Sequence, residues 1–291
     1  MYRLFVLIFV VTSCLPAFGQ MLDLTEHGKS EVNGQLSYLR DEAQTLTLAD
    51  VMAMPFTPPR SKYSPNIGFD RAAHWFKLDV RNSSETEEWL VEVAYSPLDQ
   101  IDFYLVANDS LVVQKTAGDH YPIYRRELPH RHPIFAFDIK PGDVETVYLR
   151  VQTISSVQVP VTFWHRDSFL KTSYKVQLLN GLFYGAMLLM IMYQSFLFLS
   201  VRDKITFYYV LTLLTMVNVV AFFQGYSFLY LYPNRPGFND ILAMITGPVF
   251  VVCSTMLTRA FLNIRQFSKL LDKLLLGNMF LDLVVALLMV I

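Results

Sequence analysis

The feature that most constrains this chain is an uninterrupted run of uncharged, mostly apolar residues from 178 to 200. As a helix, such a run is long enough to cross a hydrocarbon core of about 30 Å. A charged turn, Arg202-Asp203-Lys204, follows it, and a second uncharged run extends over residues 205–232. Charged residues are dense up to Lys175 and sparse afterwards. The sequence therefore predicts a water-soluble amino-terminal part and a membrane-embedded carboxy-terminal part.

Composition and motifs exclude several functions. The net charge is -1, and acidic residues outnumber basic ones before Lys171, so we expect no nucleic-acid partner. The two cysteines, Cys14 and Cys253, lie in the leader and in a membrane run, so no disulfide is expected in the soluble part. Nucleophile-elbow, zinc-protease and phosphate-loop motifs are missing. We therefore expect neither an enzyme nor a cofactor.

Residues 1–19 resemble a signal peptide. Arg3 provides a basic start, residues 4–11 an apolar core, and Ala17 and Gly19 the small residues that favour cleavage after Gly19. The apolar core is short for a retained membrane anchor. A lipoprotein-like box ending at Cys14 is a weaker alternative. The segment that follows is therefore predicted to be exported.

Residues 20–172 carry strand signals. Residues 74–82 alternate, with Phe76, Leu78 and Val80 on one face and charged side chains on the other. Turn-forming residues separate this segment from similar ones at 88–95, 100–107, 133–139, 145–152 and 157–164. Residues 25–40 are less periodic and fit a loop or an edge strand. The pattern predicts an antiparallel β-sandwich without a convincing amphipathic helix.

Residues 173–291 are predicted to form an α-helical transmembrane bundle. Spans are expected near residues 178–200, 205–231, 241–258 and 277–291, with an amphipathic segment over 259–273. If the leader exports the sandwich, the basic turns at Arg202 and Arg259 face the cytoplasm, as the positive-inside rule requires. Gly181 and Gly185 are expected to allow close packing within the bundle, and Asp282 to lie at the interface.

Candidate ligand-binding residues are aromatic rings and polar loop residues of the sandwich, because sugars offer an apolar face and a polar rim. They are Trp75, Tyr104, Asp119, Tyr121, Tyr124, Arg125, Arg126 and Trp164. Core packing is the stronger interpretation for Trp75, and a solvated loop for residues 119–126. His130 and His132 have no acidic or thiol neighbour in the sequence, so we expect an exposed turn there and no metal site.

Short motifs occur in a characteristic order along both parts of the chain. In the sandwich they are His74-Trp75-Phe76, Trp89-Leu90-Val91-Glu92, Asp102-Phe103-Tyr104-Leu105, Gly118-Asp119, Arg126, Pro133-Ile134-Phe135, Pro141-Gly142 and Tyr148-Leu149-Arg150-Val151. In the membrane part they include Asn180-Gly181-Leu182-Phe183-Tyr184-Gly185, Phe207-Tyr208-Tyr209-Val210, Phe223-Gln224-Gly225 and Arg259-Ala260-Phe261-Leu262-Asn263. In these residues the chain resembles seven-transmembrane receptors with diverse intracellular signalling modules. The resemblance implies a jelly-roll domain like carbohydrate-binding modules, seven spans and a cytoplasmic output module. About four spans fit the sequence, and no output module is visible in it.

We therefore expect a bacterial receptor of the inner membrane whose periplasmic sandwich binds a small molecule or carbohydrate and biases the helices, which lipid surrounds. A homodimer and a cytoplasmic signalling partner both stay open, as does the choice between a fragment and a naturally short chain. A transporter is an alternative, although the spans lack paired charges and repeated broken helices. An envelope protein that only binds other proteins is a further alternative.

Overall fold

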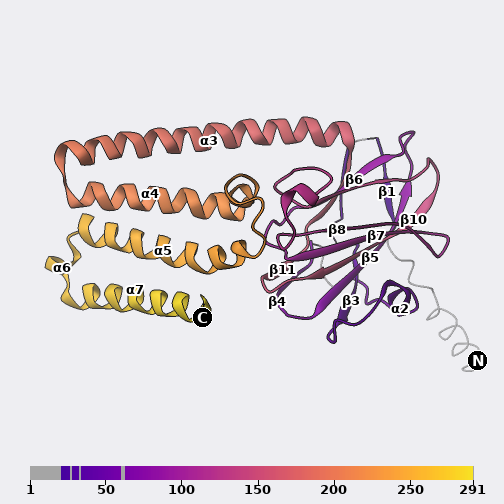
Figure 1. Cartoon of the computed structure of the whole chain (residues 1–291), viewed down its shortest axis with the longest axis horizontal. Helices are drawn as coiled ribbons and strands as arrows, with labels where there is room; N and C mark the ends of the chain where they lie inside the picture. Colours follow the sequence, from indigo (N-terminus) through magenta and orange to yellow (C-terminus); the bar gives the residue numbers. More distant parts are fainter. Residues whose placement is uncertain (1–20, 27, 33, 60–62, 291) are drawn as a thin grey trace, which may run out of the picture.

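The computed structural model describes residues 21–26, 28–32, 34–59 and 63–290 and shows a β-domain beside a layer of helices (Figure 1). The predicted leader lies outside these residues. The first half of the β-domain contains β1 (Leu22–Leu24), β2 (Lys29–Glu31), β3 (Ser37–Asp41), α2 (Leu48–Met52), β4 (Asn66–Phe69), β5 (Ala73–Asn82) and β6 (Glu88–Val93). The second half contains β7 (Gln100–Ala107), β8 (Ser110–Ala117), η1 (Ile123–Arg125), β9 (Ile134–Asp138), β10 (Val144–Gln152), β11 (Ser156–Gln158) and β12 (Val161–His165).

The strands form a β-sandwich, as predicted. One sheet has the order β1-β5-β10-β7-β8, with β3 also pairing β5, and the facing sheet has the order β2-β12-β6-β9. Side chains from both sheets meet in one core, in which the rings of Phe103 and Phe135 stack at 5.2 Å. The alternation at residues 74–82 is explained by this arrangement, because β5 buries Phe76, Leu78 and Val80 against the opposite sheet.

Some local details differ from the sequence prediction. β1 pairs β5 in parallel, so the sandwich is not wholly antiparallel. β8 was not predicted, because most of its side chains face solvent and hydrophobic alternation is weak. The segment predicted at 157–164 is two strands, β11 and β12. The short helix α2 was also missed; Thr47 and Asp50 form a capping box that starts it.

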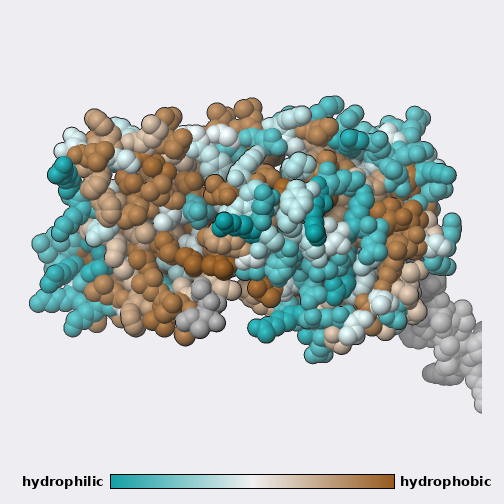
Figure 2. Space-filling view, viewed as in Figure 1, coloured by the Kyte–Doolittle hydropathy of each residue, from teal (hydrophilic) through white to brown (hydrophobic). Residues whose placement is uncertain are grey.

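The helical part contains α3 (Arg166–Val201), α4 (Lys204–Phe223), η2 (Ser227–Leu231), α5 (Phe238–Phe261), α6 (Ile264–Phe267) and α7 (Lys269–Val290). Among the described residues, α3, α4 and α5 are long and apolar enough to cross a membrane. Hydrophobic side chains cover this half of the molecule, whereas polar ones cover the sandwich and the far helical ends (Figure 2). The basic turn between α3 and α4 and the turn at α6 both lie at the end away from the sandwich (Figure 1).

The first long helix begins earlier than the apolar run that predicted it. β12 ends at His165 and α3 starts at Arg166, so the last strand continues into the first helix without a linker. The predicted close packing at Gly181 and Gly185 is not seen: a Cβ at either would meet nothing within 4 Å in the described chain. The second predicted span ends early, because Gln224 and Gly225 terminate α4 and the chain then turns through η2.

Candidate functional site at the junction of sandwich and helices

The connection between α4 and α5, residues 224–237, rests against the sandwich. We call the contact region between the sandwich and the helical part, with residues from both sides, the junction. Gly225 has φ +77°, and a Cβ there would overlap the Ser96 hydroxyl and lie 2.8 Å from the Arg131 carbonyl oxygen. Only glycine fits this close approach and this backbone conformation. Nearby, the Ile123 amide donates to the Pro233 carbonyl at 3.0 Å. The loop is therefore seated on the sandwich by backbone contacts as well as by side chains.

Two arginines of the sandwich pack on aromatic rings of this connection. The Arg131 guanidinium lies 5.4 Å from the Tyr226 ring, and that of Arg126 lies 5.5 Å from the Phe228 ring. Arg126 is buried and donates to the carbonyls of His130 at 2.8 Å and Gly118 at 3.2 Å. Burial lowers the pKa of Arg126 to about 10. The arginine thus holds the sandwich loop and the helical connection together.

A polar cluster crosses the junction beside these arginines. Asn239, at the start of α5, donates to Asp119 at 2.6 Å and accepts from the Tyr232 hydroxyl at 2.9 Å. His120 Nε2 lies 3.0 Å from an Asp240 carboxylate oxygen and 3.9 Å from one of Asp99. We call Asp99, Asp119, His120 and Asp240 the shared cluster, because the sandwich and α5 both contribute to it.

The charges of the shared cluster are strongly perturbed. Burial raises the pKa of Asp119 to about 7, even though the hydrogen bond from Asn239 lowers it. Burial also raises the pKa of Asp99, despite its hydrogen bonds with Ile154 and Thr153. For His120, burial lowers the pKa, but the bond to Asp240 and the nearby carboxylates outweigh it and the pKa is raised. Three carboxyl groups are thus brought together where water has limited access, and burial there opposes the ionised forms of Asp99 and Asp119.

A second cluster lies within the sandwich, and we call Glu92, His130 and His132 the internal cluster. Glu92 accepts from Trp164 Nε1 at 2.8 Å and lies 2.6 Å from His132 Nδ1. His132 is buried, so the expectation of an exposed turn without an acidic neighbour is wrong for it. The pairing of β6 with β9 and β12 brings Glu92 to histidines some forty residues away, which no local sequence signal shows.

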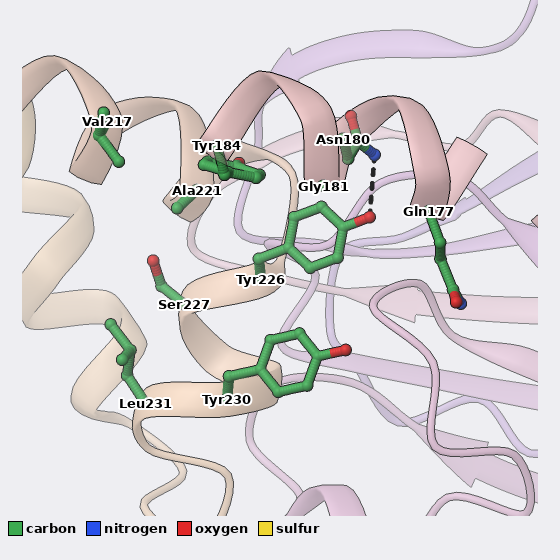
Figure 3. A pocket seen from close by; sticks show the side chains of 10 residues that line it. All are labelled: Gln177, Asn180, Gly181, Tyr184, Val217, Ala221, Tyr226, Ser227, Tyr230 and Leu231. Atoms are coloured by element: carbon green, nitrogen blue, oxygen red, sulfur yellow. Dashed lines mark hydrogen bonds between the residues drawn. The ribbon is translucent and has the colours of Figure 1, made fainter. Parts of the chain in front are cut away.

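A pocket of about 470 Å³ opens between α3, α4 and η2, at the end of the predicted membrane spans that lies nearest the sandwich (Figure 3). Tyr226 and Tyr230 point into it, and the Asn180 amide donates to the Tyr226 hydroxyl at 2.8 Å. The Tyr184 hydroxyl donates to Gln224 at 3.0 Å. The pocket is mainly apolar and is continuous with the junction through Tyr226.

A larger pocket of about 600 Å³ lies on the sandwich, away from the helices. Arg40 and Asp70 form a two-pronged contact on its wall, with distances of 2.7 and 3.1 Å. The hydrogen bond from Arg40 holds the pKa of Asp70 far below its usual range. The ring of Tyr63, 79% exposed, and that of Tyr38 also line this pocket. We call it the sandwich pocket.

The eight residues predicted to contact a ligand are not brought together. Trp75 is buried and stacks on Tyr104 at 5.7 Å, beneath α2, and Trp164 is buried beside Glu92. Asp119 and Arg126 lie in the junction, whereas Tyr124 and Arg125 are exposed and Tyr121 is half-buried. None of the eight lines the sandwich pocket.

Sequence reasoning passed over the sandwich pocket and the α5 side of the shared cluster. The proline-rich stretch Thr57-Pro58-Pro59 and Ser64-Pro65 around Tyr63 was a usable signal, because a rigid loop carrying an aromatic ring is a common binding element. Asn239 and Asp240 lie at the start of a predicted span, where polar residues are ordinary at the interface. Nothing in the sequence indicated that they contact residues 120 positions earlier.

The fold and the junction define a multi-pass membrane protein with an amino-terminal extracellular domain. The family model for 7TMR-DISM extracellular 2 matches residues 33–165, and the model for 7TM diverse intracellular signalling matches residues 176–291. The chain therefore belongs to the seven-transmembrane receptors with diverse intracellular signalling modules, and the predicted family is confirmed. These are sensory and signalling proteins, and the part of the chain that the structure describes shows no catalytic domain.

Several solved structures match part of the chain at low identity, and no curated protein matches. An alpha-xylosidase from Xanthomonas citri is 12% identical over 48% of this chain and 15% of its own, with a TM-score of 0.23. An acetyl xylan esterase from Butyrivibrio proteoclasticus is 9% identical over 47% of this chain and 32% of its own, with a TM-score of 0.23. A beta-glucosidase from Kluyveromyces marxianus is 12% identical over 44% and 16%, with a TM-score of 0.24. The chain spans less than a third of each protein's length, and such scores carry no argument about function.

Proposed function

We propose that this chain is a bacterial inner-membrane receptor whose exported sandwich binds a small carbohydrate in the sandwich pocket. Binding is relayed through the junction to the helices and from there to a cytoplasmic signalling partner. The observation that carries the relay is the seating of Gly225 against Ser96 and Arg131. A domain that was attached to the membrane part without transmitting a signal would not need this close contact between Gly225 and the sandwich.

The chemistry of the sandwich pocket supports a carbohydrate. Its volume of about 600 Å³ falls in the range of small-molecule sites. The exposed Tyr63 ring offers a face on which a pyranose can stack, because the axial hydrogens of a sugar form an apolar surface. Arg40, Asn66 and Asp70 supply donors and acceptors at the rim, and the Arg40–Asp70 contact fixes two of these side chains in advance.

Two physical connections support the relay. β12 runs directly into α3, so a shift of the strand is passed to the helix without a flexible linker. The shared cluster and the two arginine–aromatic contacts attach the sandwich to η2 and α5. A ligand biases the helices only if it binds one arrangement of these contacts more tightly than another.

Ligand binding is tested on the full chain in detergent, with xylose, glucose and cellobiose as probes and thermal unfolding as the readout. We expect at least one sugar to raise the unfolding midpoint, and Tyr63→Ala to abolish the rise. Tyr124→Ala is the matched control, because Tyr124 is an exposed tyrosine on another surface of the same domain.

The opposite result, loss of binding in Tyr124→Ala alone, would move the ligand to the loop over residues 119–126. If no sugar or other small molecule shifts the midpoint while a protein partner co-purifies, the envelope-interaction alternative replaces the sensor. The relay is tested separately by hydrogen exchange. Sugar should change exchange in residues 224–237, and Asn239→Ala should remove that change without removing binding.

A further inference from the structure

We infer that the shared cluster is a binding site for a divalent transition-metal ion of the Mn²⁺ or Zn²⁺ class, which bridges the sandwich and α5. One ligand atom from each of Asp99, Asp119, His120 and Asp240 can be chosen so that all four lie within 4.8 Å of one another. Donors bound to one ion at 2.0–2.2 Å are separated by about 3 Å when adjacent and by just over 4 Å when opposite. The limit of 4.8 Å is slightly wider than such a coordination shell, so small side-chain shifts would bring all four atoms onto one ion.

A buried oxygen without a hydrogen-bond partner is a second and separate argument for a bound ion. Asp119 is 1% exposed, and its Oδ1 has no hydrogen-bond partner among the described residues, whereas its Oδ2 accepts from Asn239. A buried carboxylate oxygen without a partner is costly, and proteins normally supply a donor or a cation. This oxygen belongs to Asp119, which lies in the shared cluster beside Asp99 and His120, so an ion bound by the cluster would give it a partner.

The other ligands are held in place and leave a way in. Asp99 accepts from Thr153 Oγ1 and the Ile154 amide, each at 2.8 Å, and each oxygen keeps a lone pair for a metal. Gly118 lets the chain turn there, since a Cβ would overlap the Asp99 carbonyl. The His120 side chain is 44% exposed, so an ion can enter from solvent. Supporting hydrogen bonds of this kind orient the ligands of metal sites.

The donor set selects the class of ion. Three carboxylates and one imidazole disfavour soft ions such as Cu⁺, and the imidazole disfavours Mg²⁺ and Ca²⁺. Buried Arg126 interacts electrostatically with Asp119 and adds one positive charge near the cluster. The three carboxylates outnumber this charge, so the site still attracts a cation. An ion here would hold Asp240 of α5 against Asp99, Asp119 and His120 of the sandwich. This site goes beyond the receptor function and does not depend on the sugar pocket.

The test uses the full chain in detergent, stripped with EDTA and then titrated with MnCl₂ or ZnCl₂. We expect one tightly bound ion per chain by elemental analysis and a higher unfolding midpoint, because ligands of the folded state stabilise it. Asp240→Asn and His120→Gln should each weaken binding at least about tenfold. Asp167→Asn should not; it is the matched control, since Asp167 lies in the first turn of α3 as Asp240 does in α5.

Three results would overturn the inference: no stoichiometric ion in the native chain, undiminished binding in both cluster variants, or loss of binding in His132→Gln alone. The last result would assign the ion to the internal cluster. If Asp240→Asn fails to fold in EDTA, the more exposed His120→Gln carries the test. Sugar binding is measured in the same samples, so loss of the ion site and loss of the sensor are separate outcomes.

Discussion

Two clusters of carboxylates and histidines lie near the same end of the sandwich, and they differ in how their polar atoms are satisfied. In the internal cluster both oxygens of Glu92 have partners, one of them Trp164 and the other His132. In the shared cluster Asp119 keeps a buried oxygen without a partner in the described chain. The first is complete within one domain, and the second is built from two.

The difference separates a structural role from a functional one. A buried pair with all its hydrogen bonds made stabilises the strands that carry it. Removing one member is costly, because the other is then buried without a partner. An unsatisfied group costs stability in the resting protein, and such groups concentrate where a protein binds or switches. The internal cluster should therefore govern sandwich stability, and the shared cluster should govern attachment of α5.

The largest expected effect is at the internal cluster. Glu92→Ala removes the partner of both His132 and Trp164 in a buried place, so it should destabilise the sandwich by about 3–5 kcal/mol. The measurement is the unfolding midpoint of the full chain, followed by tryptophan fluorescence. A decrease of less than about 1 kcal/mol in the free energy of unfolding would mean that the internal cluster does not stabilise the packing of β6 and β12.

The next effect concerns seating of the connection on the sandwich. Gly225→Ala places a Cβ into Ser96 and Arg131 at φ +77°, so it should cost about 1–3 kcal/mol and expose the connection. Gly237→Ala is the matched control, because Gly237 has φ +80° and open space at its Cβ position. Proteolysis within residues 224–237 reports the exposure. Equal effects of the two variants would show backbone strain without docking.

A pH dependence separates the clusters further. Burial lowers the pKa of His130 to about 4, with repulsion from His132 adding to the shift. The unfolded chain therefore takes up this proton first, and stability falls as pH drops from about 6.5 towards 4, by about 1 kcal/mol per pH unit. For Glu92, burial opposes ionisation but the bond from His132 outweighs it and lowers the pKa, so its contribution is lost only at lower pH.

The pKa of His120 is raised, which gives the opposite slope, so the native chain alone does not isolate His130. The comparison is with His130→Asn, whose side-chain oxygen can still accept from the His132 amide as His130 Nδ1 does. Unfolding midpoints of both chains are measured between pH 7 and pH 5. Parallel curves would contradict a buried neutral His130.

How far the sequence predicts this molecule depends on the range of the interaction. The alternation in β5 and the apolar runs of α3 to α5 are local, so the sandwich and the membrane helices were predicted. β8 was not, because its exposed Leu111 and Val112 break the alternation that identifies a strand. Asp119 and Arg126 were candidate ligand-binding residues in a stretch for which a solvated loop was the stronger interpretation. Their contacts with Asn239 and Phe228 depend on docking between distant segments, which no local pattern encodes.

The smallest expected effect completes the comparison. Asp119→Asn keeps an oxygen to accept from Asn239 and removes a carboxylate whose second oxygen has no partner. In EDTA it should therefore change the free energy of unfolding by less than about 1 kcal/mol. Glu92→Gln is the equivalent change in the internal cluster. There the amide oxygen can accept from Trp164, but the NH₂ group meets His132 Nδ1, which must shift its proton to Nε2 in order to accept. The charge-assisted bonds are lost, so the loss should be about 1–2 kcal/mol. Similar losses in the two variants would show that the shared cluster is as complete as the internal one, and would remove the physical reason for a bound ion.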